Sequence, residues 1–309
     1  MTGLIAKVGV KVTAVVCTRD RPTLLAGCLP SLVACTYRPR EVVVVDQSAD
    51  QRTRDVVRPW QAVTPDLVYV PTDTRGVSAA RNLACAHASG EVVAFTDDDC
   101  VVEPGWLDAI VAELHAEPRP AAVCGRALPL VEAPLVADPV SVRTGLGRQL
   151  FERPCSPWRV GTGNNMAFAR AALVAVGAFD EQLGPGARFK NGEESDLFYR
   201  LLRRGYPVLY SPAPTVYHRQ WRSPSQQIAL ARNYGIGIGA FAAKHIGTGD
   251  PLPLRTLGGW VVATALDLAR RLRRRDWAGA QSSANLLVGM AVGVGQMARG
   301  PGGTAWPRR

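Results

Sequence analysis

A short apolar run that ends in three consecutive carboxylates constrains this chain more than any other feature. Val92–Phe95 has the length and β-rich composition of a buried strand, and the carboxylates of Asp97–Asp99 follow it. Adjacent carboxylates repel one another and resist removal from water, so such a cluster is easiest to keep when a cation lies among its oxygens. Oxygen ligands suit Mg²⁺ or Mn²⁺, and Mg²⁺ typically binds few protein carboxylates together with substrate phosphates. The alternative is a solvated acidic turn before a helix at Trp106.

A second apolar run ends in a carboxylate in the same way. Val42–Val45 is continuously apolar, as expected of a parallel strand covered on both faces, and Asp46 follows it. Strand-like segments (11–17, 41–46, 67–70 and 92–95) alternate with helix-like segments (23–34, 51–60 and 76–88). This alternation predicts an α/β fold with a Rossmann-like, doubly wound and mostly parallel sheet. Ligands of such sheets bind beyond the carboxyl ends of the strands, so Asp46 and Asp97–Asp99 are expected on one rim.

The second half of the chain continues this pattern less regularly. Helices are predicted at 106–114, 171–176 and 193–204, and short strands at 121–125, 208–210 and 215–218. Residues 127–160 contain several prolines and no clear period, so we expect a long connection or flap there. The segment 161–168 indicates a turn that enters a strand, and the Gly- and charge-rich segment 183–192 indicates a mobile loop.

The C-terminal segment 251–309 differs from the rest in charge and predicts a helical extension. Its nine arginines and two aspartates carry +7 of the chain's net charge of +10. Two apolar, helix-compatible runs, 257–268 and 284–297, flank the basic run 270–275. Each is shorter than the roughly 20 residues that a membrane-spanning helix needs. A basic amphipathic pair on a membrane surface, helices packed on the body and a dimer contact all remain open.

Composition also limits the compartment and the partners. The seven cysteines form no CxxC pair and several lie in apolar runs, which favours reduced thiols in the cytoplasm over disulfides or a zinc site. Residues 1–10 lack a signal-peptide pattern. We therefore expect a cytoplasmic protein that could bind peripherally to the inner face of the cell membrane. Residues 1–250 carry only +3 and no aromatic–basic stripe, so nucleic acid is not an expected partner.

No glycine-rich phosphate loop is present. The chain has no GxxxxGK motif, and Gly235–Gly239 follows a helix-like segment, so it indicates a small-residue packing surface and not a dinucleotide site. A cation at Asp97–Asp99 would then have to neutralise any bound diphosphate, which would make a nucleoside diphosphate a good leaving group. Asp46 could accept a hydrogen bond from a base or a ribose.

Five motifs in this order resemble those of the family 2 glycosyltransferases of GT-A fold. They are Thr18–Pro22, Val45–Asp46, Gly76–Asn82, Gly90–Asp99 and Glu193–Leu197, and the resemblance covers about residues 11–222. It implies inverting transfer of a sugar from a UDP-, dTDP- or GDP-sugar to an acceptor hydroxyl, with Mg²⁺ or Mn²⁺. The acceptor could be lipid-linked. The implied organisation is a nucleotide-sugar-binding half (1–105), an acceptor-binding and catalytic half (106–250) and the basic helical tail (251–309).

The resemblance also implies roles for single residues. Donor contacts are expected from Thr18, Arg21, Asp46, Arg81, Asp97 and Asp98, metal coordination from Asp99 with Asp97 and His218, and acceptor contacts from Asn164, Asn165 and Trp221. Each has an alternative role in a turn or in the core, and a single histidine is more often structural than a ligand.

A catalytic base is expected at the start of the helix near residue 193. One carboxylate must take the proton of the acceptor hydroxyl as the anomeric carbon is attacked. The family usually has a Glu-Asp pair, where this chain has Glu193-Glu194, so Glu194 aligns with the base and Asp196 is its rival. Simple capping of the helix is the structural alternative. A non-catalytic nucleotide-sugar-binding or scaffold protein on the same fold is the alternative function.

Overall fold

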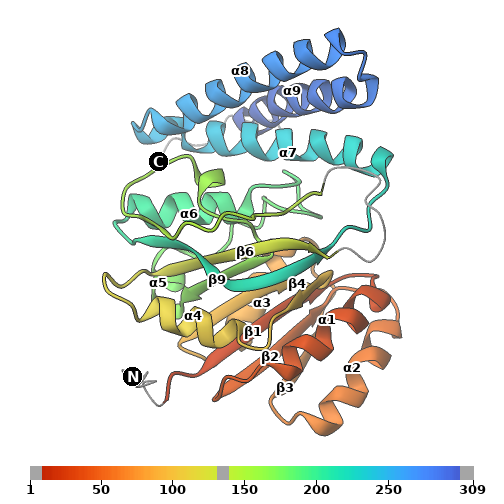
Figure 1. The fold of residues 1–309 in the computed structure, drawn as a ribbon, viewed down its shortest axis with the longest axis vertical. Coiled ribbons are helices and arrows are strands. Elements are labelled where there is room, and N and C mark those ends of the chain that lie inside the picture. Colours follow the sequence, from red (N-terminus) through yellow and green to blue (C-terminus); the bar gives the residue numbers. More distant parts are fainter. Residues whose placement is uncertain (1–8, 131–138, 300–309) are drawn as a thin grey trace.

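The computed structural model describes residues 9–130 and 139–299 (Figure 1). The first half contains β1 (Val12–Thr18), α1 (Pro22–Ala34), β2 (Arg40–Asp46), α2 (Arg52–Val63), β3 (Leu67–Pro71), α3 (Val77–His87), β4 (Val92–Asp97), β5 (Cys100–Val102) and α4 (Trp106–Leu114). It continues with β6 (Ala122–Leu130), β7 (Gln149–Phe151), η1 (Pro157–Arg159), β8 (Asn165–Ala169), α5 (Arg170–Ala175), α6 (Glu193–Arg203) and β9 (Val208–Arg219). The last helices are α7 (Pro224–His245), η2 (Ile246–Thr248), α8 (Leu252–Arg273) and α9 (Trp277–Ala298).

One central sheet runs through the body in the order β3-β2-β1-β4-β8-β6-β9-β5, with β7 paired to β9. The strands β3, β2, β1 and β4 are parallel, and β8 joins β4 antiparallel. The predicted α/β fold with a doubly wound sheet is therefore confirmed, and the second half adds antiparallel pairs to the parallel core.

Helices cover both faces of this sheet. One core contains side chains of α1, α2 and α4, and the other contains side chains of α3, α5 and α6. Successive residues of β2 point into opposite cores: Val42 and Val44 into the first, Val43 and Val45 into the second. This is why the run is apolar without interruption.

The pairing of β1 with β2 and β4 brings the residues of the predicted rim close together. Thr18 at the end of β1 lies opposite Asp46 at the end of β2, and Cys17 lies opposite Asp97 at the end of β4. The carboxyl ends of three neighbouring parallel strands therefore present their polar residues side by side.

Two segments differ from their predicted form. Within 127–160, β6 extends to Leu130 and β7 belongs to the sheet, while residues 131–138 lie outside the described ranges. The two short strands expected at 208–210 and 215–218 are one strand, β9, whose register on β6 shifts between Cys124 and Arg126. Pro212 and Pro214 lie at this shift, between the two segments that were expected to be separate strands. Proline cannot donate a hydrogen bond to a neighbouring strand, so it is tolerated at such irregularities.

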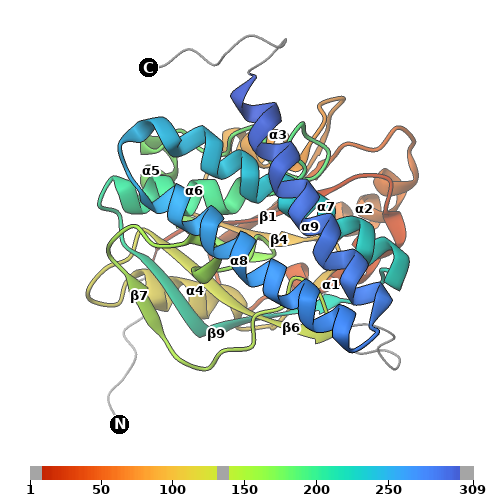
Figure 2. The same ribbon diagram turned by 90° about the horizontal axis from the view of Figure 1, so that it is seen from above.

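The helices α7, α8 and α9 form a separate layer over α6 (Figures 1 and 2). Glycines of α7 meet glycines of α9: a Cβ at Gly235, Gly239, Gly289 or Gly293 would overlap a backbone carbonyl of the facing helix. The predicted small-residue packing surface is thus confirmed. In the described residues, no helix is long and apolar enough to cross a membrane.

Candidate active site

A cavity of about 710 Å³ lies between the strand rim, the start of α6 and the helical layer. It is lined by most of the residues predicted from the sequence, namely Thr18, Arg21, Arg81, Asp97, Asp99, Asn164, Glu193, Glu194, His218 and Trp221. Asp46 lines a second cavity nearby, whereas Asp98, Asn165 and Asp196 are buried outside the lining of either.

The three consecutive aspartates do not share one environment. Asp97 and Asp99 line the cavity, while Asp98 turns into the protein and is fully buried. There it accepts a 2.6 Å hydrogen bond from Thr18 Oγ1 and lies 2.9 Å from Arg21 Nη2. Burial raises the pKa of Asp98 to about 7, although the Arg21 guanidinium opposes this shift. Asp98 therefore holds the motif in place, and Asp97 and Asp99 face the ligand space.

Asp99 comes directly before β5, and two side chains contact its carboxylate there. Trp221 Nε1 donates a 2.8 Å hydrogen bond to its Oδ2, and His218 Nε2 lies 3.4 Å from its Oδ1. Burial acts to raise the pKa of Asp99, but the contacts with His218 and Trp221 outweigh it and bring the pKa to about 2. His218 lies next to Asp99 because it pairs with Cys100, where β9 runs antiparallel to β5.

Arg81 joins the strand rim to α6. Its guanidinium lies 3.1 Å from Asp97 Oδ1 and 3.0 Å from Glu193 Oε1, and it donates to Gly163 O. The side chains of Arg81 and Glu193 are almost fully buried, so their ion pair is shielded from solvent, whereas the Asp97 side chain is 35% exposed. A cation is thus held between the aspartate motif and the predicted base.

Glu194 has a buried carboxylate oxygen that is free at the site. Its Oε2 has no hydrogen-bond partner among the described residues, and the same is true of Oε2 of Glu193. Burial and the adjacent charge of Glu193 raise the pKa of Glu194 to about 8. The start of α6 is set by Gly192, whose φ of +96° favours glycine. A carboxyl group with a pKa near neutrality that faces a cavity is suited to proton transfer.

Asp196, two residues further on, has the opposite surroundings. It is fully buried and lies 2.7 Å from His245 Nε2, 2.8 Å from Lys244 Nζ and 2.7 Å from Arg200 Nε. Burial acts against ionisation, but Lys244, His245 and Arg200 together hold the pKa of Asp196 far below its usual range. Asp196 therefore ties α6 to α7, with its carboxylate directed away from the cavity.

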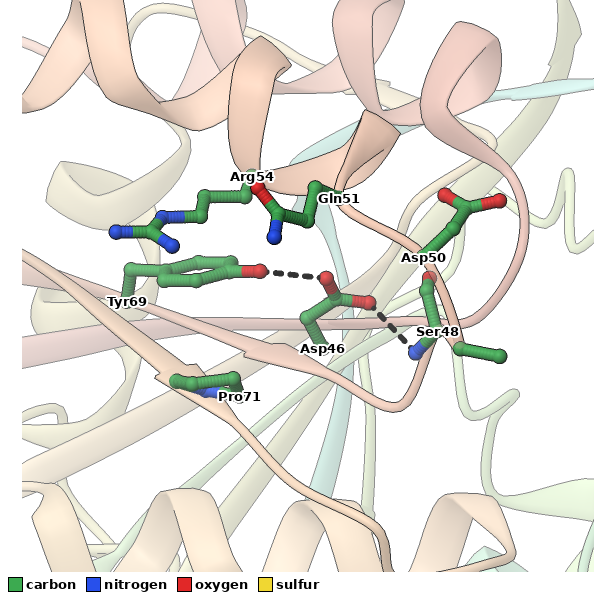
Figure 3. Close-up of a pocket in the computed structure, with 8 residues that line it drawn as sticks. Asp46, Ser48, Asp50, Gln51, Arg54, Tyr69 and Pro71 are labelled. Atoms are coloured by element: carbon green, nitrogen blue, oxygen red, sulfur yellow. Dashed lines mark hydrogen bonds between the residues drawn. The ribbon is translucent and has the colours of Figure 1, made fainter.

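Asp46 lies in the second cavity, of about 360 Å³, at the end of β2 (Figure 3). Tyr69 Oη donates a 2.7 Å hydrogen bond to Asp46 Oδ2, and the Ser48 amide donates to Oδ1 at 2.9 Å. Gln51, which precedes α2, and Arg54 of α2 complete the polar wall. Tyr69 was not predicted as a site residue, although its strand is parallel to β2 and ends beside Asp46.

The two predicted acceptor asparagines have separated roles. Asn164 lines the cavity, where its amide donates to Ser141 O and accepts from Thr162 Oγ1. Asn165 accepts from Trp106 Nε1 and donates to the carbonyls of Arg126 and Pro214. The Asn165 amide is therefore committed to holding β8, β6 and β9 together.

The side of the cavity under the helical layer is apolar. We call it the apolar roof: Leu230 and Ile238 of α7, Trp260 of α8, Leu286 of α9 and Trp158 of η1. Tyr234 of α7 lies between the first two, and the spacing of four places all three on one helix face. Local sequence gives little sign of this surface, because residues such as Leu230, Ile238 and Leu286 have the pattern of ordinary helix packing.

The carboxylates suit a hard cation of the Mg²⁺ or Mn²⁺ type. No group of three or more His, Cys, Asp or Glu side chains within residues 9–130 and 139–299 is arranged to hold a metal by itself. Asp97 and Asp99 both present oxygens to the cavity, and His218 is adjacent. Two carboxylates fit a cation that takes its remaining ligands from substrate phosphates and water.

Comparison with known proteins places this geometry in a family. The family model described as glycosyl transferase family 2 matches residues 13–137. The matched segment, 13–137, is a domain of this family. A glucosyl-dolichyl phosphate glucuronosyltransferase of Haloferax volcanii is 26% identical over 216 residues, which are 68% of this chain and 69% of the relative. A pre-mycofactocin glycosyltransferase of Mycobacterium tuberculosis is 28% identical over 197 residues, which are 62% of this chain but 40% of the relative.

Solved structures agree on the fold of this glycosyltransferase. A mannosyltransferase from Pyrobaculum calidifontis, in complex with GDP-Man and Mn²⁺, superimposes with a TM-score of 0.60 at 22% identity. The match covers 92% of this chain and 86% of the other, so it includes the helical layer. The expected GT-A fold is confirmed, and the chain is an enzyme of the glycosyltransferase class.

Proposed function

We propose that this glycosyltransferase moves a sugar from a nucleoside diphosphate sugar to an acceptor hydroxyl with inversion, in a reaction that depends on Mg²⁺ or Mn²⁺. The observation that carries the proposal is the position of Glu194. Its carboxyl group is buried, has a free oxygen and lies in one cavity with Asp97 and Asp99. A single base opposite a donor site is the arrangement that direct displacement requires.

The donor would span both cavities. Asp46 and the wall beside Tyr69 would receive the nucleobase, and Thr18 at the adjoining strand end would contact the nucleoside. Arg21 and Arg81 would lie along the diphosphate, with Asp98 holding Arg21 in place. The Mn²⁺-bound mannosyltransferase of similar fold, which carries GDP-Man, supports this use of the cavity.

Asp97 and Asp99, with His218 beside them, are the residues that would hold the ion. When bound, a divalent cation neutralises the diphosphate and makes the nucleoside diphosphate a better leaving group. Trp221 donates to Asp99, so its indole would have to yield that oxygen or share it.

Glu194 would act as the base. Its Oε2 takes the proton of the acceptor hydroxyl while that oxygen bonds to the anomeric carbon and the diphosphate leaves. The pKa of about 8 makes the carboxylate a stronger base than an ordinary glutamate. Glu193 and Arg81 would keep the helix terminus in register with the donor through their 3.0 Å ion pair.

The acceptor would bind between Asn164, Trp221 and the apolar roof, and we propose that it is lipid-linked. The Haloferax volcanii relative, which is named for glucosyl-dolichyl phosphate, supports this class of acceptor. The function divides as the chain does, with donor binding in 1–105, acceptor binding and catalysis in 106–250 and membrane contact in 251–309.

The exposed face of α8 supports contact with a membrane surface. Leu254, Val261, Val262 and Leu266 are exposed along it, and the basic run 270–275 follows at its end. Trp277, which is 67% exposed, lies at the next turn. Apolar side chains flanked by arginines suit a helix in the interface of an anionic membrane. We propose that the enzyme works at the cytoplasmic face of such a membrane.

A thermal-shift titration tests the proposed function. Wild type is heated with Mn²⁺ and each of UDP-, dTDP- and GDP-sugars, and one metal–donor pair should raise its melting temperature because only the folded state binds. Asp99→Asn should lose the rise while keeping its own melting temperature near that of wild type. If no donor raises the melting temperature of wild type with Mn²⁺ or Mg²⁺, the proposal is wrong. Donor binding without any transfer would favour a non-catalytic sugar-nucleotide-binding protein.

A further inference from the structure

We propose that the apolar roof is a binding subsite for the hydrocarbon chain of the acceptor. The substrate class is then an amphiphile, in which a hydroxyl-bearing head lies next to an alkyl or isoprenoid chain. This inference rests on the proposed function, because it places the head of that amphiphile at Glu194. It adds the location of the chain and the residues that select it.

The apolar roof lines the same cavity as Glu194. The α7 residues Leu230 and Ile238 share one helix face, and each of the other two helices adds one side chain, Trp260 and Leu286. Trp158 meets Trp260 edge to face with ring centroids 6.2 Å apart. The apolar surface is continuous with the space that Glu194 faces, so one molecule can occupy both.

The carboxylates and the apolar side chains of the cavity come from different elements. Asp97, Asp99 and Glu194 lie on the side of the strand rim and the start of α6, whereas the described residues of the roof are all uncharged. Tyr234, which lies beside the roof on α7, has its hydroxyl 3.4 Å from Ser141 Oγ and so has a partner within the protein. A bound sugar would need several hydrogen bonds there, whereas a hydrocarbon chain needs only contact with apolar atoms.

The apolar roof adjoins exposed apolar residues of α8. Trp260 lines the cavity, and the next two residues, Val261 and Val262, are exposed by 40% and 59%. In Figure 2, α8 and α9 lie across the outer side of the helical layer. A chain longer than the roof can therefore pass from the cavity to the exposed apolar face of α8, and from there into a lipid layer.

Calorimetric binding of two glucosides tests the subsite without knowledge of the natural acceptor. n-Octyl β-D-glucoside, below its micelle-forming concentration, is compared with methyl β-D-glucoside, which has the same head. Wild type should bind the octyl compound at least tenfold more tightly. In Leu286→Asn this preference should fall below threefold, while Val288→Asn, an exposed position on the same helix, should keep it. If Leu286→Asn fails to fold, Leu286→Ala is used, with a partial loss expected.

The outcomes separate this inference from its alternatives. Equal binding of the two glucosides by wild type, or an octyl preference that survives in Leu286→Asn, overturns the subsite. Trp260→Leu should keep the octyl preference, because leucine is also apolar. Loss of methyl glucoside binding in Trp260→Leu would instead show that the roof stacks a sugar. The donor-linked thermal shift is measured on the same proteins: its absence in wild type contradicts the proposed function, whereas its presence with no octyl preference contradicts only the subsite.

Discussion

The rim and the roof of one cavity are built by opposite means. On the rim, buried carboxylates are held by cations: Arg81 lies between Asp97 and Glu193, and Arg21 lies beside Asp98. The roof belongs to helices that approach one another at glycines and present apolar side chains. The rim should therefore respond to pH, metal and charge, and the roof to changes in side-chain volume.

Two carboxyl groups in the first turn of α6 also have opposite surroundings. Glu194 and Asp196 are two residues apart and both are acidic, yet one has a raised pKa and the other a lowered pKa. The difference comes from α7, which brings Lys244 and His245 to Asp196 and no cation to Glu194. Position near a helix N-terminus does not decide the charge of a carboxyl group; its partners across the packing interface do.

The largest expected effect is on catalysis by Glu194→Gln. Loss of the base should lower kcat by about 10²- to 10⁴-fold, the usual contribution of general base catalysis, with donor affinity unchanged. Steady-state kinetics and donor titration measure both. Glu152→Gln, at an exposed position, is the matched control. A kcat within threefold of wild type would move the base to another residue.

Asp196→Asn should affect stability most. It leaves the cations of Lys244 and Arg200 without their buried partner, and such a loss typically costs about 3–5 kcal/mol. Urea unfolding gives the free energy of unfolding. Asp276→Asn, which also removes an Asp–Arg pair but at a solvent-exposed site on the α8–α9 turn, should cost much less. Equal effects would show that the Asp196 cluster does not anchor α6 to α7.

Gly239→Ala should have the next largest effect, and it tests the roof. The added methyl group overlaps Met290 O of α9, so the helices must move apart, at a cost of about 1–3 kcal/mol. Gly259→Ala adds the same group where nothing lies within 4 Å, and it should be neutral or stabilise by up to about 1 kcal/mol. Thermal unfolding compares the two variants, and similar melting temperatures would contradict close packing at Gly239.

A further expected effect is the pH dependence that Glu194 imposes. Its pKa is about 8 in the folded protein and 4.5 as an ordinary glutamate, so between these values the unfolded state binds fewer protons than the folded state. The free energy of unfolding should therefore fall as pH rises from about 5 to 8. Transfer activity should rise over the upper part of that range as the carboxylate forms. In Glu194→Gln this part of the slope should vanish; an unchanged slope would mean that Glu194 titrates normally.

The sequence by itself determined the sheet and its rim. Short uninterrupted apolar runs such as Val42–Val45, alternating with helix-like segments, predict parallel strands covered on both faces, and their ends place Asp46 and Asp97 on the same rim, on either side of β1. The motif order was enough to predict the family, because each motif is local and its spacing follows from the alternation of strands and helices.

Only the tertiary structure decided what each polar residue does. Local sequence cannot reveal that Asp98 turns inward to Thr18, that Asn165 is committed to Trp106, or that β9 is one strand. Nor does it show that α7, α8 and α9 each send a side chain into the catalytic cavity. These features depend on contacts between residues far apart in the sequence, such as Trp221 and Asp99, which are 122 residues apart. The chemistry of a buried carboxyl group is set by the side chains that packing brings to it, and packing is a property of the whole fold.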